Sequence, residues 1–242
     1  MNDWNSVRLI AHRCGGALAP ENSLSGLRVA RARGYQAVEF DVMLTADGTP
    51  VLIHDETLER TTSGQGRVAA TADADLFGLS LACGPFAAWP TERVPRLKEA
   101  ATACRELGLL ANVEIKPATG TESATARRVA ADVASLWQGA PPPLLSSFSE
   151  EALAVARSVA PQLPRALLVE RVPSDWAARI DRLGCVALHC AARQLTWRWL
   201  PEAHRRGLAV RCYTVNAEAQ AARLLARGVD ALFTDAVDRL MA

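Results

Sequence analysis

Short apolar runs rich in β-branched residues alternate with amphipathic stretches along almost the whole chain. Eight of these runs have the length and composition of buried strands: 8–11, 37–42, 112–116, 144–148, 166–169, 186–189, 210–215 and 231–234. The segments between them have the apolar spacing of helices: 23–33, 96–107, 121–137, 150–160, 175–183, 196–206 and 217–227. Glycine follows several of the helical segments, where its tolerance of left-handed backbone can end a helix.

This regular alternation of strand and helix indicates a parallel sheet in which the helices form the crossovers. Eight repeats are enough to close such a sheet, and a (β/α)8 barrel commonly occupies about 250 residues as one unit. We therefore predict an α/β protein in which residues 1–242 form one domain. A (β/α)8 barrel is favoured, and an open, doubly wound sheet is the alternative.

One segment departs from the alternation, because residues 37–44 are followed by the Asp47-Gly48 turn and then by 50–54, with no room for a helix. This pattern predicts a β-hairpin. With residues 47 and 48 at the tip, Asp41 is expected to lie opposite His54. Because side chains alternate between the faces of a strand, Glu39 and Asp41 share one face.

Residues 56–95 show little helix or strand periodicity. Loops of this length without structure of their own are uncommon and are often functional. We interpret the segment as an insertion over the mouth of the barrel, with a plain surface loop as the alternative.

Composition excludes several classes of protein. Half of the residues are hydrophobic and the formal net charge is +1, so the basic excess typical of nucleic-acid or membrane-surface binders is missing. The N-terminus lacks the features of a leader, and no run approaches the roughly 18 apolar residues of a membrane span. The six cysteines include no Cys-x-x-Cys pair, and we expect reduced thiols. We expect a cytoplasmic protein with no nucleic-acid partner and no stable membrane association.

Three acidic side chains lie on predicted buried strands: Glu39 and Asp41 on one, and Glu114 on another. Their alternation allows all three to point into one cavity at the strand ends. Carboxylates forced together repel one another, so their burial calls for a cation. All-oxygen ligands favour a hard ion, Mg²⁺ or Ca²⁺, over zinc.

Two of the four histidines are expected next to this acidic cluster. His12 ends the first strand beside Arg13, and His54 ends the hairpin. Histidine can act as base or acid near neutrality, and arginine matches the geometry of phosphate oxygens. Together with the acidic cluster these residues point to a phosphoryl site. Of the remaining histidines, His204 is expected on a helix surface, and His189 is a candidate for the cavity.

The chain also carries an ordered series of motifs that resembles the glycerophosphodiester phosphodiesterase family, and is most similar to its cytosolic bacterial members. The series covers nearly the whole chain. It consists of His12-Arg13-Cys14-Gly15-Gly16, Ala19-Pro20-Glu21-Asn22-Ser23, Glu39-x-Asp41, Asp47-Gly48-x-Pro50-Val51-x-x-His54-Asp55, Leu58-x-Arg60-Thr61-Thr62, Glu114-Ile115-Lys116-Pro117, Ser146-Ser147-Phe148, Tyr213-Thr214-Val215-Asn216 and Phe233-Thr234-Asp235.

The resemblance implies a (β/α)8 TIM barrel of the phospholipase-C-like phosphodiesterase type, with a small insertion after the hairpin. It implies that Glu39, Asp41 and Glu114 bind one divalent metal, with Mg²⁺ expected first and Ca²⁺ or Mn²⁺ as alternatives. It also implies that His12 and His54 are the general base and general acid, and we assign His12 as the base.

By the same resemblance, Arg13 and Lys116 hold the phosphate, Asn22 orients the site and Tyr213 lines the pocket. One departure concerns Cys14, which stands where the family usually has glycine. If that position requires a positive φ, a cysteine is strained there. A nucleophilic thiol at Cys14 is a second interpretation, although no motif matches a thiol hydrolase.

The implied substrates are soluble glycerophosphodiesters such as glycerophosphocholine and glycerophosphoethanolamine, and the products are sn-glycerol 3-phosphate and an alcohol. The nucleophile is either water or the adjacent glycerol hydroxyl. We expect a monomer or a homodimer. One rival is a lysophospholipase-D-like enzyme with an apolar rim in 76–90 formed by Phe77, Phe86 and Trp89. The other is a silent phosphodiester-binding protein, which should lack a histidine or carboxylate of the site.

Overall fold

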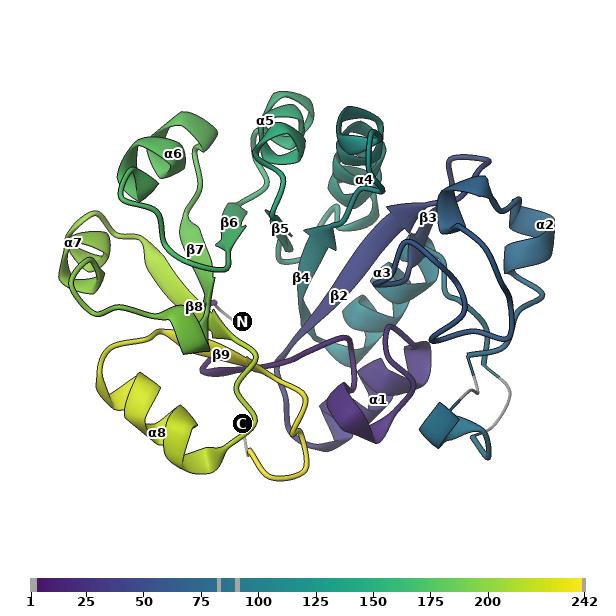
Figure 1. The fold of residues 1–242 in the computed structure, drawn as a ribbon, viewed down its shortest axis with the longest axis horizontal. Helices are drawn as coiled ribbons and strands as arrows, with labels where there is room; N and C mark the ends of the chain where they lie inside the picture. Colours follow the sequence, from purple (N-terminus) through teal and green to yellow (C-terminus); the bar gives the residue numbers. More distant parts are fainter. Residues whose placement is uncertain (1–3, 82–83, 90–91, 241–242) are drawn as a thin grey trace.

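A computed structural model describes residues 4–81, 84–89 and 92–240. Its parallel strands form a closed barrel surrounded by helices (Figure 1). Closure occurs between the first strand and both of its neighbours, since β1 pairs in parallel with β9 and with β2. The strands of the barrel are β1 (Leu9–Ala11), β2 (Ala37–Leu44), β4 (Leu110–Ile115), β5 (Leu144–Ser147), β6 (Arg165–Val169), β7 (Ala187–Ala191), β8 (Ala209–Tyr213) and β9 (Ala231–Thr234). The (β/α)8 prediction is confirmed, and the open sheet is excluded.

The outer ring of helices packs on the outward faces of the strands and forms the main hydrophobic core with them. Local signals explain several helix ends. The Ser23 and Ser149 hydroxyls cap α1 and α5, and Gly108 and Gly184 end α3 and α6 in left-handed backbone. The ring consists of α1 (Leu24–Ala32), α3 (Leu97–Leu107), α4 (Glu122–Leu136), α5 (Glu150–Val159), α6 (Trp176–Leu183), α7 (Leu200–Arg205) and α8 (Glu218–Ala226).

The prediction of a helix over 196–206 is wrong at its start, because α7 begins only at Leu200. Pro201 gives the physical reason. It has no N–H to donate, and its ring would clash with the carbonyl of Trp197 in a continuous helix, so it is tolerated only in the first turn.

The hairpin exists, but its predicted register is wrong by one residue. β3 (Pro50–Leu52) pairs antiparallel with β2, and the Ile53 amide donates to the Asp41 carbonyl, so Asp41 faces Ile53 and not His54. The turn is longer than two residues, since the Thr45 amide donates to the Thr49 carbonyl and leaves three residues between them. His54 lies two residues beyond the end of β3 at Leu52 and lines the cavity that contains Asp41.

The segment 56–95 has structure of its own, although residues 82, 83, 90 and 91 lie outside the described residues. It contains η2 (Val68–Ala70), α2 (Asp73–Leu76) and η3 (Gly84–Phe86), and it lies beside the hairpin (Figure 1). Apolar side chains of the segment, including Leu58, Val68 and Leu76, pack on Met43 and Val51 of the hairpin in a separate small core. A packed segment of this kind differs from a plain surface loop.

Candidate active site

Three carboxylates from two adjacent strands meet inside the barrel. Asp41 of β2 is paired in register with Glu114 of β4, and Glu39 lies two residues before Asp41 on the same face. All three are buried, and one oxygen of each lies within 4.8 Å of the others. The cluster is at the carboxyl ends of the strands, where TIM barrels carry their active sites.

Burial shifts the protonation of this cluster. Burial, together with the charge of Asp41, raises the pKa of Glu39 to about 7 and that of Glu114 to about 8. Burial also opposes ionisation of Asp41, but the charges of Lys116, His54 and Arg13 outweigh it and lower the pKa of Asp41. Near neutral pH the cluster therefore holds protons that a cation would have to displace.

The donor set fits a hard divalent cation. Glu39 Oε2 accepts the Arg13 backbone N–H at 2.9 Å, whereas its buried Oε1 has no hydrogen-bond partner among the described residues. An orphaned carboxylate oxygen inside an acidic cluster is an expected ligand for Mg²⁺, Mn²⁺ or Ca²⁺.

These pKa shifts predict that the stability of the protein without metal falls as pH rises, whereas its stabilisation by added metal increases. A carboxyl whose pKa is raised from 4.5 in the fold stabilises the protein at low pH, and that stability is lost as pH rises through about 7 and 8. We expect the melting temperature of chelator-treated protein to fall from about pH 5 to about pH 8, while stabilisation by Mg²⁺ grows over that range. Thermal unfolding at constant ionic strength measures both. Stabilisation by Mg²⁺ that shrinks as pH rises would contradict this electrostatic description.

His12 follows β1 and is held by a residue that sequence reasoning missed. Its Nδ1 lies 2.7 Å from Asp235 Oδ1, and its Nε2 lies 3.8 Å from Glu39 Oε2. Because a carboxylate only accepts, Nδ1–H donates to Asp235 and Nε2 is directed to the acidic cluster. Burial opposes protonation, but the bond to Asp235 and the charge of Glu39 outweigh it and raise the pKa of His12. The motif Phe233-Thr234-Asp235 was the sequence signal from which a role for Asp235 in the site could have been predicted.

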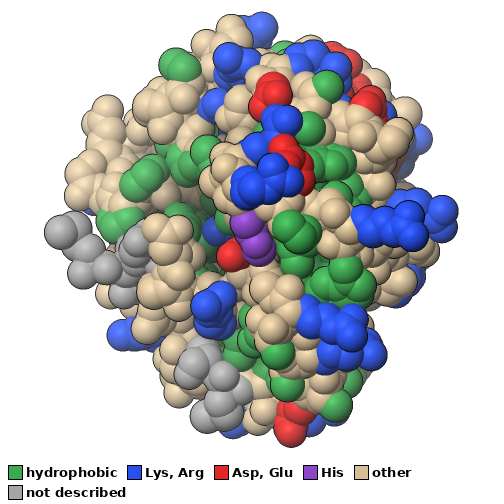
Figure 2. Space-filling view, turned by 90° about the vertical axis from the view of Figure 1, so that its left-hand side faces the viewer, with side chains coloured by type: hydrophobic (Ala, Val, Ile, Leu, Met, Phe, Trp, Pro, Cys, Tyr) green, Lys and Arg blue, Asp and Glu red, His purple; other side chains and the backbone are tan. Residues whose placement is uncertain are grey.

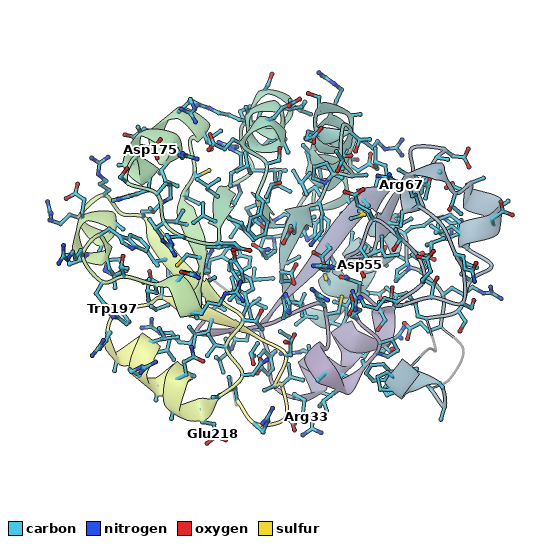
Figure 3. The ribbon with its side chains drawn as sticks, viewed as in Figure 1. Arg33, Asp55, Arg67, Asp175, Trp197 and Glu218 are labelled. Carbon is cyan, nitrogen blue, oxygen red and sulfur yellow. The ribbon has the colours of Figure 1, made fainter. Side chains whose placement is uncertain are left out.

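His54 has a matching anchor, since its Nδ1 lies 2.6 Å from Asp55 Oδ1. Asp55 is labelled in Figure 3 near the centre of the strand ring, whereas Asp175 and Glu218 lie at the outer edge. Arg60 pairs with Asp55 at 2.5 Å and with Glu21 at 2.6 Å, which ties the hairpin to the loop after β1. Burial lowers the pKa of His54. The two histidines are thus fixed in the same way, by an aspartate at Nδ1.

The other predicted site residues surround the same cluster. Lys116 Nζ lies 3.3 Å from Asp41 and 3.7 Å from Glu114. Asn22 donates to Asp41 Oδ2 at 2.9 Å and accepts the Asp41 amide at 3.1 Å, which fixes that side chain. The Tyr213 hydroxyl donates to a backbone carbonyl on β6 at 2.9 Å. Arg13 Nη1 lies 3.1 Å from Glu21, and its Nε lies 3.9 Å from Asp41.

The loop after β1 is strained at non-glycine positions. Arg13, Cys14 and Asn22 have φ of 49°, 72° and 56°. Gly16 at φ 55° is also required sterically, because a Cβ there would lie 2.3 Å from the backbone oxygen of Asp235. The departure at Cys14 thus falls on a left-handed position, and the Cys14 amide is held there by a 2.7 Å bond to the Glu39 carbonyl.

The Cys14 thiol does not have the properties of a nucleophile. It is fully buried, and burial raises its pKa well above the ordinary value, so the thiolate is suppressed. We expect Cys14→Ala to retain phosphodiesterase activity within about threefold and to lower the melting temperature modestly, because a small cavity replaces the sulfur. Steady-state kinetics and thermal unfolding measure the two effects. Loss of turnover in a folded Cys14→Ala protein would restore the thiol interpretation.

Two cavities that share lining residues contain the site. A cavity of about 230 Å³ holds the acidic cluster, both anchored histidines and Lys116. A second, of about 600 Å³, shares His12 and Arg13 with it and is lined on its other side by Arg60, Thr61 and Phe86 from the 56–95 segment. A larger groove of about 690 Å³ near Cys104 contains none of these residues. The active-site cavity is therefore identified by its carboxylate and histidine side chains and not by its volume.

The remaining sequence predictions have mixed outcomes. His189 is buried and lines the smaller cavity, whereas the His204 side chain is 38% exposed beside Asp230. The predicted apolar rim is narrower than expected, because Phe77 packs beneath the Arg96 guanidinium at 3.4 Å. On the face carrying α6 to α8, side chains of both charges lie among uncharged ones (Figure 2). Among the described residues, no helix combines the length and apolar character needed to cross a membrane.

Comparisons with known proteins agree with this geometry. The model of the glycerophosphoryl diester phosphodiesterase family matches residues 12–239. An Oleispira antarctica phosphodiesterase, solved in complex with the product sn-glycerol-3-phosphate, is 34% identical with a TM-score of 0.91, covering 96% of this chain and 94% of that one.

Two curated relatives carry the same function in their names. A glycerophosphodiester phosphodiesterase of Caldanaerobacter subterraneus is 26% identical over 96% of both chains. Mouse glycerophosphodiester phosphodiesterase 1 is 35% identical over 61% of this chain, and the match spans 44% of the mouse protein. From the family match and the shared architecture we conclude that this chain belongs to the glycerophosphoryl diester phosphodiesterase family.

Proposed function

We propose that this enzyme carries out metal-dependent hydrolysis of glycerophosphodiesters such as glycerophosphocholine and glycerophosphoethanolamine, releasing sn-glycerol 3-phosphate and the alcohol. The observation that carries the proposal is the buried Glu39, Asp41 and Glu114 cluster, flanked in one cavity by two aspartate-anchored histidines. The Oleispira relative with bound sn-glycerol-3-phosphate supports the same product here.

Glu39, Asp41 and Glu114 would hold one divalent cation, with Mg²⁺ proposed first and Ca²⁺ or Mn²⁺ as alternatives. When bound, the cation neutralises charge on the non-bridging phosphoryl oxygens. Arg13 and Lys116 add positive charge at the same cavity and orient the diester. Asn22 acts through Asp41, which it holds by two hydrogen bonds.

We propose His12 as the general base and His54 as the general acid. Each ring is oriented by its aspartate, so that Nε2 is the nitrogen available for proton transfer. The raised pKa of His12 and the lowered pKa of His54 run against this assignment when the protein side chains alone are considered. The pKa of His12 is raised partly by Glu39, and a cation on Glu39 would cancel that attraction. The assignment therefore applies to the metal-loaded enzyme.

A second candidate is activity on lysophospholipids. It is favoured by the 600 Å³ cavity beside the site, which presents Leu81, Pro85 and Phe86 to a substrate. Such a surface suits an acyl chain as well as a soluble headgroup.

The deciding experiment measures glycerol 3-phosphate released from glycerophosphocholine by chelator-treated protein, with and without Mg²⁺, Mn²⁺ or Ca²⁺. Lysophosphatidylcholine is assayed in parallel for choline release. We expect turnover of glycerophosphocholine that depends on added metal. Folded protein that turns over only the lysolipid would favour the second candidate, and the absence of both activities would reject the enzyme assignment.

A further inference from the structure

Two polar side chains that line the same cavity as the acidic cluster have no role in the chemistry described so far. His189 of β7 and Asn112 of β4 are 0% and 1% exposed, and both line the 230 Å³ cavity. Asn112 is paired with Glu39 and precedes Glu114 by two residues on the same face of β4, so it lies one layer deeper in the barrel. Each side chain has one polar atom without a hydrogen-bond partner in the described part of the chain: Nδ1 of His189 and Oδ1 of Asn112.

The protonation of His189 follows from its neighbour. Arg211 Nη1 lies 3.3 Å from His189 Nε2, and a guanidinium can only donate, so Nε2 accepts and the ring proton is on Nδ1. Burial, together with the charge of Arg211, lowers the pKa of His189 well below its ordinary value and keeps the ring neutral. The orphaned Nδ1 is therefore a hydrogen-bond donor.

Asn112 presents the complementary atom. Its amide Nδ2 donates to Ser146 Oγ at 2.9 Å, and its Oδ1 is an orphaned acceptor. The cavity thus contains one buried donor and one buried acceptor, and each is costly to leave unpaired.

The supporting residues hold this pair in place. The His189 ring packs on Phe233, with the ring centroids 4.9 Å apart. The guanidinium of Arg211, the hydrogen-bond partner of His189, lies 4.9 Å from the centroid of the Trp4 ring. A ring fixed on two sides presents its donor in a constant direction. Leu168 and Phe148 provide apolar cavity wall near this polar pair.

We propose that His189 and Asn112 form a hydroxyl-recognition pair that binds the glycerol part of the substrate. The hydroxyls of the glycerol part can accept from His189 Nδ1–H and donate to Asn112 Oδ1. An ionised phosphate or a carbonyl oxygen only accepts and would face the Asn112 oxygen unfavourably. The pair therefore selects an alcohol over a hydroxyl-free chain, and the inference rests on the proposed function.

The test compares glycerophosphocholine with n-propylphosphocholine, which has the same headgroup and chain length but no hydroxyls. His189→Met keeps a weak thioether acceptor for Arg211 and removes the donor, and Asn112→Leu removes the acceptor at similar size. We expect each variant to lower kcat/KM for glycerophosphocholine about ten- to hundredfold and to change that for n-propylphosphocholine less than about threefold. His204→Met, on the surface, serves as the matched control.

A second readout does not depend on turnover. Calorimetric titration with sn-glycerol 3-phosphate and with n-propyl phosphate should show weaker binding of the first only, in both variants, with unchanged affinity for Mg²⁺. Equal losses for both ligands, or no loss for either, would overturn the inference. A reduced affinity for Mg²⁺ in Asn112→Leu would also overturn it, because Asn112 would then act as a metal ligand.

The two proposals fail in different ways. Wild-type protein that releases no glycerol 3-phosphate would reject the proposed function, and the hydroxyl pair with it. Wild-type protein that hydrolyses both diesters equally well would reject the hydroxyl pair alone.

Discussion

Replacing Glu114 with Gln is expected to reduce metal-dependent hydrolysis of glycerophosphocholine by about a thousandfold or more, since a bound cation supplies several kcal/mol of transition-state stabilisation. The stability of the metal-free protein should change little. Burial raises the pKa of Glu114 to about 8, so its carboxyl is largely protonated near neutral pH and an amide is a close substitute. The same substitution should abolish the thermal stabilisation produced by Mg²⁺.

The matched control is Glu106→Gln on α3, where the carboxylate is exposed and lies outside the site. It should retain both activity and stabilisation by Mg²⁺. Steady-state kinetics and thermal unfolding with and without chelator separate the two effects. If Glu114→Gln kept wild-type activity with a normal requirement for Mg²⁺, Glu114 would not be a ligand.

Replacing either anchored histidine with Asn is expected to lower kcat about 10²- to 10⁴-fold, the usual contribution of general acid–base catalysis. The two variants should differ when the leaving group changes. With the p-nitrophenyl ester of glycerol 3-phosphate, the departing phenolate needs little protonation. His54→Asn should then recover most of its activity, whereas His12→Asn should stay slow.

His204→Asn is the matched control for this series, because His204 is exposed on α7 and pairs only with Asp230 among the described residues. If His12→Asn recovered activity on the p-nitrophenyl ester and His54→Asn did not, His12 would be the general acid and His54 the general base. Recovery of neither would indicate that both rings act mainly in binding. Asp235→Asn is informative beside them, because it keeps His12 in place but weakens the preference for the Nδ1–H tautomer.

Local features of the chain were sufficient for much of the fold and for the acidic cluster. Period-two alternation places Glu39 and Asp41 on one face of β2 whatever the surrounding structure, and the strand–helix repeat allowed the closed barrel. Ser23, Gly108 and Gly184 marked helix ends through backbone chemistry that acts within a few residues. Such interactions are short in range, which is why sequence reasoning found them.

Two sequence predictions, the hairpin register and the start of α7, were wrong because one or two residues decide the backbone geometry there. The hairpin register depends on the length of the turn between Thr45 and Thr49, and a slip of one residue changes every facing pair. The start of α7 depends on Pro201, whose steric effect outweighs the helical spacing of its neighbours.

The sequence by itself thus determined the barrel, the acidic face of β2 and the family, because each depends on local periodicity or on motif order. Only the tertiary structure decided the partners of His12 and His189. Asp235 meets His12 across 223 positions because β9 pairs with β1 at barrel closure, and Arg211 sets the tautomer of His189 because β7 and β8 are adjacent. Hydrogen bonds between side chains distant in sequence depend on strand order and register, which no local pattern specifies.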